Sequence, residues 1–415
     1  MTEIIRRETT PARRGIFYGF IIVGVASLIL ALTYGTRSAF GVFFKPMAHD
    51  FGWTRAMTSG AFSISLAIEG LMGIVMGGIN DRFGPRVVLM VCAALIGLGF
   101  FLMSEINAIW QLYLFYGLVI GMGSGGTFIP LVSTVSRWFI KRRTLMTGIV
   151  VSGIGLGTLL LPPLANQLIL TYGWRKSYLI MGVLTLVIAM ACAWFLRRDP
   201  AQKGDVPYGE GNNVSDRADT KASGYSFGEA VFTRQFWMVY FIMFCFGFTA
   251  FSFGPHFVPH ITDQGISPGS AAMVISVTGG VSIIGSLLLG NLADRIGNSK
   301  VFAVGLLGLV IYYAGLIPAR ELEMFYLLAS VSSFTAGGAG ACESPLIASL
   351  FGLKSHGLIY GVVGTGFTLG AAIGPYLTGY IYDVNASYNV ALITNAILGI
   401  IGIILALLLK PTAKR

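Results

Sequence analysis

The stretch Gly77–Arg86, GGINDRFGPR, returns 213 residues later as Gly290–Gly297, GNLADRIG. Both copies keep the order Gly-x-x-x-Asp-Arg-x-Gly, and each follows a long apolar run. The first glycine allows two helices to approach, and the Asp can accept hydrogen bonds from a neighbouring helix N-terminus. The Arg supplies a partner charge at the membrane surface. Two copies of one motif at a fixed offset indicate a chain built from two related halves.

The same offset relates thirteen positions along the chain. The pairs are Thr36 and Thr249, Phe40 and Phe253, Gly41 and Gly254, Pro46 and Pro259, Gly77 and Gly290, Asp81 and Asp294, Arg82 and Arg295, Gly84 and Gly297, Gly125 and Gly338, Gly148 and Gly361, Gly153 and Gly366, Gly157 and Gly370, and Pro162 and Pro375. A duplicated bundle around a central site is typical of an alternating-access transporter.

The composition requires lipid as the solvent. Of the 415 residues, 55% are hydrophobic and 11% are charged, and the mean hydropathy is +0.76. Soluble proteins carry about 25% charged residues. The four cysteines lie in apolar runs at scattered spacing, which favours packing residues over a disulfide or a metal site. No catalytic or nucleotide-binding pattern occurs, so we expect neither an enzyme nor a cofactor.

Apolar stretches of about 20 residues between charged or turn-rich breaks predict twelve membrane spans. Their limits are 17–45, 55–78, 86–104, 109–135, 144–170, 176–196, 237–261, 269–290, 300–318, 323–350, 356–382 and 388–409. These limits predict a six-helix bundle at 1–196, a cytoplasmic linker at 197–236 and a second six-helix bundle at 237–415. The segment between the bundles is rich in Gly, Asp, Asn and Ser, which indicates flexibility.

Charge asymmetry sets the predicted orientation. With a cytoplasmic N-terminus, the cytoplasmic loops and ends hold 22 of the 28 Lys and Arg residues. The outer side holds Lys45, Arg55, Arg175, Lys176 and Arg320. The positive-inside rule therefore predicts that both termini are cytoplasmic. The basic residues are scattered over short loops, so we expect no nucleic-acid binding. We also expect the protein to be a monomer in the lipid bilayer.

The duplicated loops are candidates for a gate. Asp81, Arg82 and Arg86 after the second span, and Asp294 and Arg295 after the eighth, can hold the inner ends of the helices together and release them. An ordinary charged loop with a turn glycine is the alternative.

These residues resemble the signature loop of the major facilitator superfamily. The resemblance covers nearly the whole chain and implies an all-α membrane protein with twelve transmembrane helices in two pseudo-symmetric six-helix bundles. It also implies a bacterial inner membrane as the location.

A narrower resemblance concerns two segments. The segment Arg137–Gly148 leading into Ser152–Gly157, and the segment Tyr34–Lys45, resemble the monocarboxylate transporters and the bacterial oxalate/formate antiporter group. That family carries a cation within about one position of Arg37. The resemblance implies a small organic anion as substrate and adds Arg137 to the gating candidates.

The chain departs from the pattern of these families in its second half. An acidic residue and an arginine of the eighth span are replaced by Ser282 and Ser286. No Lys or Arg lies between His356 and Asp383, where the antiporters use a lysine. The usual anion anchor of the second half is therefore missing.

A charged side chain within a membrane span is costly in free energy, so its presence indicates a functional role or an ion pair. Arg37 has a fork suited to a carboxylate, which makes it the main candidate for an anion anchor; the alternatives are snorkelling to the outer surface and a structural bridge to Glu69. Glu69 is a candidate proton carrier, with the same bridge as its alternative. Glu343 is a third candidate for proton coupling; a gate residue or a helix-end contact is the other interpretation.

His256 and His260 are four apart on one predicted helix face. No third ligand lies near them in the sequence, so we favour proton sensing or substrate contact by His256 over a metal site. A polar helix end at the cavity mouth is the alternative. Single hydroxyls on the cavity helices are candidate hydrogen-bond partners of a substrate, although each can bond a neighbouring backbone instead. They belong to Tyr34, Tyr116, Ser152, Ser286 and Thr365.

The sequence thus predicts a secondary active transporter of a small organic anion, a monocarboxylate or similar acid, driven by protons or by anion exchange. Two alternatives stay open: an exporter of cationic or neutral compounds, and a membrane receptor that transports nothing.

Overall fold

The computed structural model describes residues 17–139, 143–209, 224–352 and 356–409, which form helices and their connections with two isolated β-bridges. The elements before residue 210 are α1 (Tyr18–Ser38), α2 (Phe40–Phe51), α3 (Arg55–Phe83), α4 (Pro85–Ser104), α5 (Ile109–Leu112), the π-helix η1 (Tyr113–Ile120), α6 (Gly121–Gly125), α7 (Phe128–Trp138), α8 (Arg143–Phe195) and the 3₁₀ turn η2 (Pro200–Lys203). Those from residue 224 on are α9 (Phe227–Val231), α10 (Arg234–Phe251), α11 (Phe257–Asp263), α12 (Pro268–Ile296), α13 (Asn298–Leu316), α14 (Leu322–Phe351), α15 (His356–Asn385) and α16 (Asn389–Leu408).

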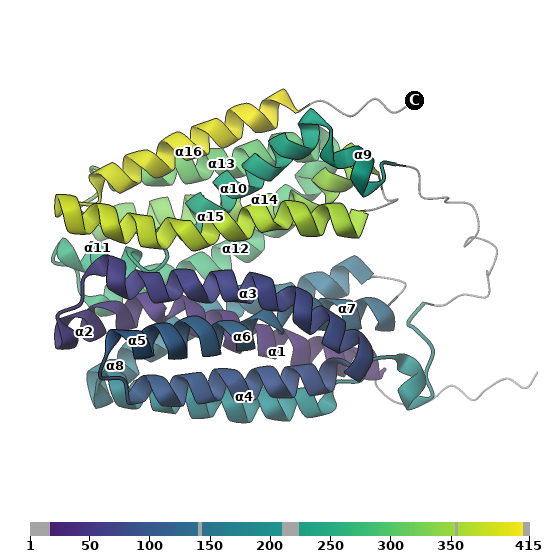
Figure 1. The fold of residues 1–415 in the computed structure, drawn as a ribbon, viewed down its shortest axis with the longest axis horizontal. Helices are drawn as coiled ribbons and strands as arrows, with labels where there is room; N and C mark the ends of the chain where they lie inside the picture. Colours follow the sequence, from purple (N-terminus) through teal and green to yellow (C-terminus); the bar gives the residue numbers. More distant parts are fainter. Residues whose placement is uncertain (1–16, 140–142, 210–223, 353–355, 410–415) are drawn as a thin grey trace, which may run out of the picture.

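The helices form two layers, α1–α8 in one and α10–α16 in the other (Figure 1). We call these layers the first and second halves. Within each half the long helices run side by side along the longest axis of the molecule. Helices α2 and α11 lie at one end of this axis, the α11 end, and α9 lies at the other, the α9 end (Figure 1).

The helices are long and apolar enough to cross a membrane. Nine described segments meet both conditions, and one of them, Leu145–Phe195, reverses direction at Gly173, where φ is 78°. Helices α3 and α14, with 29 and 30 residues, are also long enough to cross a membrane. These passes are consistent with the predicted twelve, and the chain is a multi-pass membrane protein.

The structure differs from the predicted spans at two equivalent places. The first predicted span is interrupted at Ala39, between α1 and α2, and the seventh at residues 252–256, between α10 and α11. The interruptions lie 213 residues apart, as the repeat requires. In the second, Pro255 lacks the N–H that a continuous helix needs, and the N–H of His256 bonds the Phe253 carbonyl instead.

Glycines at equivalent positions allow close helix packing in both halves, as the sequence predicts. A Cβ added to Gly157 of α8 would collide with the carbonyl of Ala31 in α1. The counterpart Gly370 of α15 stands in the same relation to Phe244 of α10, and Phe244 is the counterpart of Ala31. The duplicated sequence therefore encodes a duplicated packing contact.

The halves meet through equivalent helix pairs, with α3 packing on α15 and α12 on α8. Ser276 of α12 donates to the carbonyl of Leu159 in α8, which lacks its usual partner because residue 163 is proline. Its counterpart in α3, Ser63, accepts the backbone N–H of Tyr376 in α15 at 3.0 Å. Tyr376 lies at the position equivalent to Pro163, so the interface follows the pseudo-twofold of the repeat.

Both described ends of the segment between the halves are ordered. Tyr208 pairs with Phe139 in a β-bridge, and Gly224 pairs with Gly352. Ser226 and Glu229 form a capping box at the start of α9. The central part predicted to be flexible, residues 210–223, lies outside the described residues.

Candidate functional site

A half-buried ion pair joins α1 to α3. Arg37 Nη1 lies 2.5 Å from Glu69 Oε2, and the Tyr34 hydroxyl donates to Glu69 Oε1 at 3.3 Å. The side chains of Arg37 and Glu69 are only 16% and 17% exposed. Tyr34 and Arg37 are three residues apart, so one face of α1 presents both to the same carboxylate.

The Arg37 guanidinium also contacts both halves of the protein. Its central carbon lies 4.3 Å from the centre of the Tyr34 ring and 5.5 Å from the centre of the Phe251 ring in α10. Aromatic faces attract a cation at such distances. Arg37 is therefore held between its own helix, the carboxylate of α3 and an aromatic side chain of the second half.

A cavity of about 320 Å³ lies between the halves, with Tyr34 and Arg37 in its wall. Among the described residues that line it, Arg37 is the only Asp, Glu, His, Lys or Arg. The second half contributes mainly aromatic and aliphatic side chains, including Phe251, Phe253, Phe257, Leu309, Tyr312 and Tyr313. The cavity is thus an apolar chamber with one cationic group on one side.

A second, much smaller cavity of about 10 Å³ lies behind the ion pair and is bordered by Arg37, Glu69 and Tyr116. Its volume is that of about one water molecule. The Arg37–Glu69 pair therefore separates a large chamber from a small polar one.

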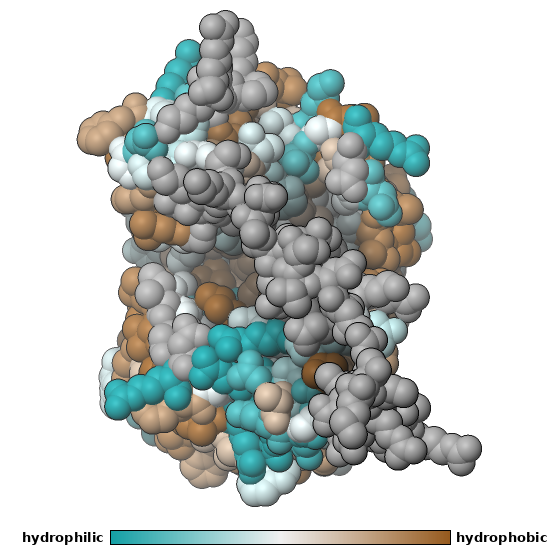
Figure 2. Space-filling view, turned by 90° about the vertical axis from the view of Figure 1, so that its right-hand side faces the viewer, coloured by the Kyte–Doolittle hydropathy of each residue, from teal (hydrophilic) through white to brown (hydrophobic). Residues whose placement is uncertain are grey.

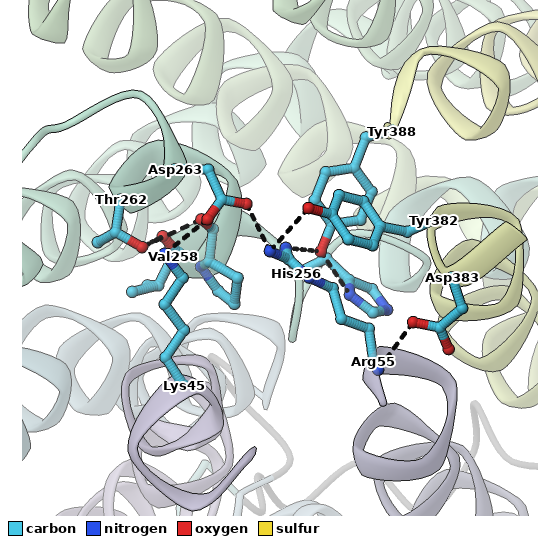
Figure 3. Close-up of polar contacts among 10 residues, drawn as sticks. Lys45, Arg55, His256, Val258, Thr262, Asp263, Tyr382, Asp383 and Tyr388 are labelled. Atoms are coloured by element: carbon cyan, nitrogen blue, oxygen red, sulfur yellow. Dashed lines mark hydrogen bonds and ion pairs between the residues drawn. The ribbon is translucent and has the colours of Figure 1, made fainter. Parts of the chain in front are cut away.

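The two ends of the molecule differ. Seen from the α9 end, the surface is hollowed between the two halves, with apolar side chains deep in the hollow (Figure 2). At the α11 end a set of side chains from both halves meets, and we call it the closing cluster (Figure 3). Its members are Lys45, Arg55, His256, Asp263, Tyr382, Asp383 and Tyr388.

One carboxylate of the closing cluster bridges two cations across the interface. Asp263 Oδ1 lies 2.7 Å from Lys45 Nζ, and Asp263 Oδ2 lies 2.6 Å from Arg55 Nη2. A second carboxylate, Asp383 of α15, accepts the backbone N–H groups of Arg55 and Ala56 at 3.0 and 2.8 Å. It thus caps the N-terminus of α3 from the opposite half, where the helix dipole favours an anion.

His256 lies in the closing cluster and not in the cavity wall. Its Nε2 is 2.8 Å from the Pro375 carbonyl, so this nitrogen carries the proton and donates. Its Nδ1 lies 3.1 Å from the hydroxyl of Tyr388, which in turn accepts from Arg55. Burial raises the pKa of Tyr388, in the turn between α15 and α16, so its hydroxyl keeps its proton and donates to His256. His260 is also buried and lies outside the cavity lining.

The predicted hydroxyl groups are divided among several places. Tyr34 lies in the cavity wall, and Tyr116 is fully buried beside the ion pair. Ser152, Ser286 and Thr365 each donate to the carbonyl three residues earlier in their own helices and do not line the cavity.

Glu343 lies in α14, apart from the Arg37–Glu69 pair. It accepts a hydrogen bond of 3.2 Å from the Tyr360 hydroxyl in α15. It is part-buried and does not line the cavity.

The predicted gating residues lie on α3, α4, α7 and α12. Arg82 and Arg295 are exposed, Arg86 stacks 3.5 Å from the centre of the Trp194 ring, and Arg137 lies 3.5 Å from Asp199. The side chains of Asp81 and Asp294 are outside the described part of the chain, as are residues 140–142 of the fifth-span motif.

The closing cluster is the part of the molecule that the sequence analysis did not find. In the sequence Lys45 and Arg55 are recognised only as outer-side charges, and Asp383 only as the limit of a stretch without Lys or Arg. The available signal is their arrangement, because Lys45 and Arg55 lie at the outer ends of spans of the first half, whereas Asp263 and Asp383 directly follow spans of the second half.

The fold and the interface cavity define a multi-pass membrane transporter. A model of the Major Facilitator Superfamily matches residues 26–261 and 239–415, which together span most of the sequence. The chain belongs to the Major Facilitator Superfamily, and it is a transporter and not an enzyme.

Several proteins named as transporters are similar to the chain over most of its length. Monocarboxylate transporter 11 of Homo sapiens is 29% identical over 90% of this chain and 79% of its own length. The oxalate:formate antiporter of Oxalobacter formigenes is 25% identical over 94% and 91%. A probable sulfoacetate transporter of Cupriavidus necator is 25% identical over 94% of both chains.

Solved structures support the same fold. A bacterial homologue of the human lysosomal transporter Spinster, in an inward-facing and unoccupied conformation, has a TM-score of 0.72 at 16% identity. The comparison covers 94% of this chain and 96% of that one.

Proposed function

We propose that the protein is a secondary active transporter of a small organic anion, a monocarboxylate, which it carries by alternating access with coupling to protons. The observation that carries the proposal is the Arg37–Glu69 pair at 2.5 Å, with Arg37 in the wall of the cavity between the halves. The relatives named for monocarboxylate, oxalate:formate and sulfoacetate transport support an anionic substrate.

The ion pair suggests how a proton and a substrate are coupled. While Glu69 is ionised, its carboxylate pairs with the Arg37 guanidinium and competes with a substrate carboxylate for it. Protonation of Glu69 removes that competitor and leaves a cation that needs a partner, because an uncompensated buried charge is strongly unfavourable. A substrate carboxylate can then bind the guanidinium fork in place of Glu69. Proton and anion therefore enter together.

The contrast between the two ends supports a rocking motion of the halves. Opening the α11 end requires the separation of Lys45 and Arg55 from Asp263, and of Asp383 from the start of α3. The equivalent helix contacts of the repeat provide two related interfaces about which the halves can turn. In the present conformation side chains of the two halves meet at the α11 end (Figure 3), and the surface at the α9 end is hollowed (Figure 2).

We further propose the orientation that charge asymmetry predicts. The α9 end would face the cytoplasm with both termini, in the inner membrane of a bacterium. Arg82 lies in the last turn of α3, Arg86 in the first turn of α4 and Arg295 in the last turn of α12. The halves would be bundles at 1–196 and 237–415, joined by a cytoplasmic linker at 197–236, and the working unit would be a monomer.

Proteoliposomes test this function. Purified protein should accumulate a labelled monocarboxylate such as pyruvate when the outside is more acidic than the lumen. Arg37→Gln should reduce this uptake at least tenfold, since the substrate loses its bidentate partner, and Arg37→Lys should keep part of it. Absence of flux for every organic acid tried, with folded protein and with either pH gradient, would overturn the proposal. Export of cations that survives in Arg37→Ala would support the cation exporter instead.

A further inference from the structure

Resting on the proposed function, we infer that the preferred substrate is a monocarboxylate with a bulky apolar body, aromatic or branched. Its carboxylate lies at Arg37 and its body lies against the second half. The inference comes from the distribution of charge and apolar surface around the cavity, and it separates this site from one built for a two- or three-carbon acid.

The repeat makes the asymmetry of the cavity explicit. The position equivalent to Arg37 is Ala250, which also lines the cavity. The position equivalent to Glu69 is Ser282, whose hydroxyl donates to the Gly279 carbonyl in its own helix. The first half therefore supplies an ion pair, whereas the second half supplies no charge at the matching positions.

The second half presents a continuous apolar wall instead. Phe251 is within 5.5 Å of the Arg37 guanidinium, measured to the ring centre, so the wall begins beside the anchor. It continues through Phe257, Leu309 and Tyr312. An acid held by Arg37 would bring whatever lies beyond its carboxylate against this surface.

Three hydroxyls of this wall already donate their protons within the protein. The hydroxyls of Thr249, Thr278 and Ser332 donate their protons to carbonyls of their own helices. Those three protons are therefore not available to a second anionic group of a substrate. A dianion would thus place its second carboxylate or sulfonate where the described lining residues offer no cation.

The cavity volume fits a larger acid. Its value of about 320 Å³ lies within the range of about 300–1,000 Å³ that is typical of small-molecule sites. A three-carbon acid bound at Arg37 would leave much of the apolar wall in contact with water. Each methylene that covers this wall should improve affinity about fourfold, until the cavity is filled.

A series of acids with one head group and growing bodies tests the inference. Uptake into proteoliposomes is measured for pyruvate, 4-methyl-2-oxopentanoate and phenylpyruvate, with oxalate and sulfoacetate as dianionic competitors. We expect KM to fall at least tenfold from pyruvate to phenylpyruvate, and neither dianion to compete. Equal or better transport of pyruvate, or strong competition by oxalate, would overturn this inference and leave the transport of acids intact. No flux of any acid would instead refute the proposed function.

A cavity-filling variant locates the apolar subsite. Ala336 of α14 lies in the cavity wall, so Ala336→Leu should raise the KM for phenylpyruvate at least fivefold more than that for pyruvate. The matched control is Ala341→Leu, which adds the same volume at an exposed position of the same helix, outside the cavity lining. An equal rise in KM for both acids would contradict the placement of the substrate's apolar body beside Ala336.

Ligand stabilisation of the unaltered protein gives an independent readout. Phenylpyruvate should raise the melting temperature of the purified protein more than pyruvate at the same concentration, because it binds the folded form more tightly. The reverse order would count against the inference even if Ala336→Leu does not fold.

Discussion

Arg55 Nη2 lies 2.6 Å from Asp263 Oδ2, and the two residues come from opposite halves of the protein. Asp263 also lies 2.7 Å from Lys45, so a single carboxylate neutralises two cations at the α11 end. All three side chains are partly exposed, between 15% and 39%. Each pair is therefore weak by itself, and the cluster is suited to opening and closing.

Removing this carboxylate should favour opening of the α11 end. Two partly exposed ion pairs contribute about 0.4–2 kcal/mol together. Asp263→Asn should therefore lower the ratio of closed to open molecules by about 2- to 30-fold. Pulsed EPR between spin labels at His49 and Glu321 measures the separation of the halves. The control is Glu323→Gln, an exposed carboxylate of α14 at the same end. Unchanged distances in Asp263→Asn would mean that other contacts close this end.

The repeat explains how much of the fold could be predicted from the sequence. The glycines that allow close helix packing recur 213 residues apart. The contact of Gly157 with α1 therefore implies the equivalent contact of Gly370 with α10. The interruption at Ala39 was not predicted. The length of an apolar stretch does not reveal where a backbone N–H bonds the carbonyl three residues earlier instead of four, as that of Val42 does with Ala39. Its counterpart at 252–256 had a local signal in Pro255.

The candidate site was predictable only in part. Arg37 and Glu69 were both recognised as charges within spans, but their pairing stayed open because span limits do not fix the rotation of α1 against α3. The closing cluster depends on how the halves meet, and no local pattern reports contacts between residues as distant as Arg55 and Asp383. Ser152 and Thr365 were offered as substrate contacts, yet each donates to its own helix.

The proposed competition between Glu69 and a substrate predicts a pH dependence of binding. In the unaltered protein, anion affinity should rise as the pH falls, because protonation of Glu69 frees Arg37. In Glu69→Gln the competitor is absent, so affinity should be high and nearly independent of pH, while proton-driven accumulation is lost. Melting-temperature shifts with phenylpyruvate from pH 5 to pH 8 measure the binding. A slope of equal size in both proteins would exclude Glu69 as the competing group.

Stability should show that the two charges depend on each other. Arg37→Gln leaves the half-buried Glu69 carboxylate without its cation, so the loss of stability should lie between about 0.2–1 kcal/mol, as for an exposed pair, and about 3–5 kcal/mol, as for a fully buried one. The double variant Arg37→Gln/Glu69→Gln should melt closer to the unaltered protein than Arg37→Gln does. Additive effects of the two substitutions would show that the pair contributes no coupling.

The duplicated glycines should fall into two groups with opposite responses to a methyl group. In Gly157→Ala and Gly370→Ala the new Cβ meets the backbone of the neighbouring helix, and such overpacking costs about 1–3 kcal/mol. Gly148 and Gly361 are equivalent glycines of the same two helices, and a Cβ added to either meets open space. Gly148→Ala and Gly361→Ala are therefore matched controls, and they should stabilise their helices by up to about 1 kcal/mol. The melting temperatures of the four variants measure these changes in stability. Destabilisation confined to one half would show that the duplicated packing contact is not energetically equivalent in the two halves.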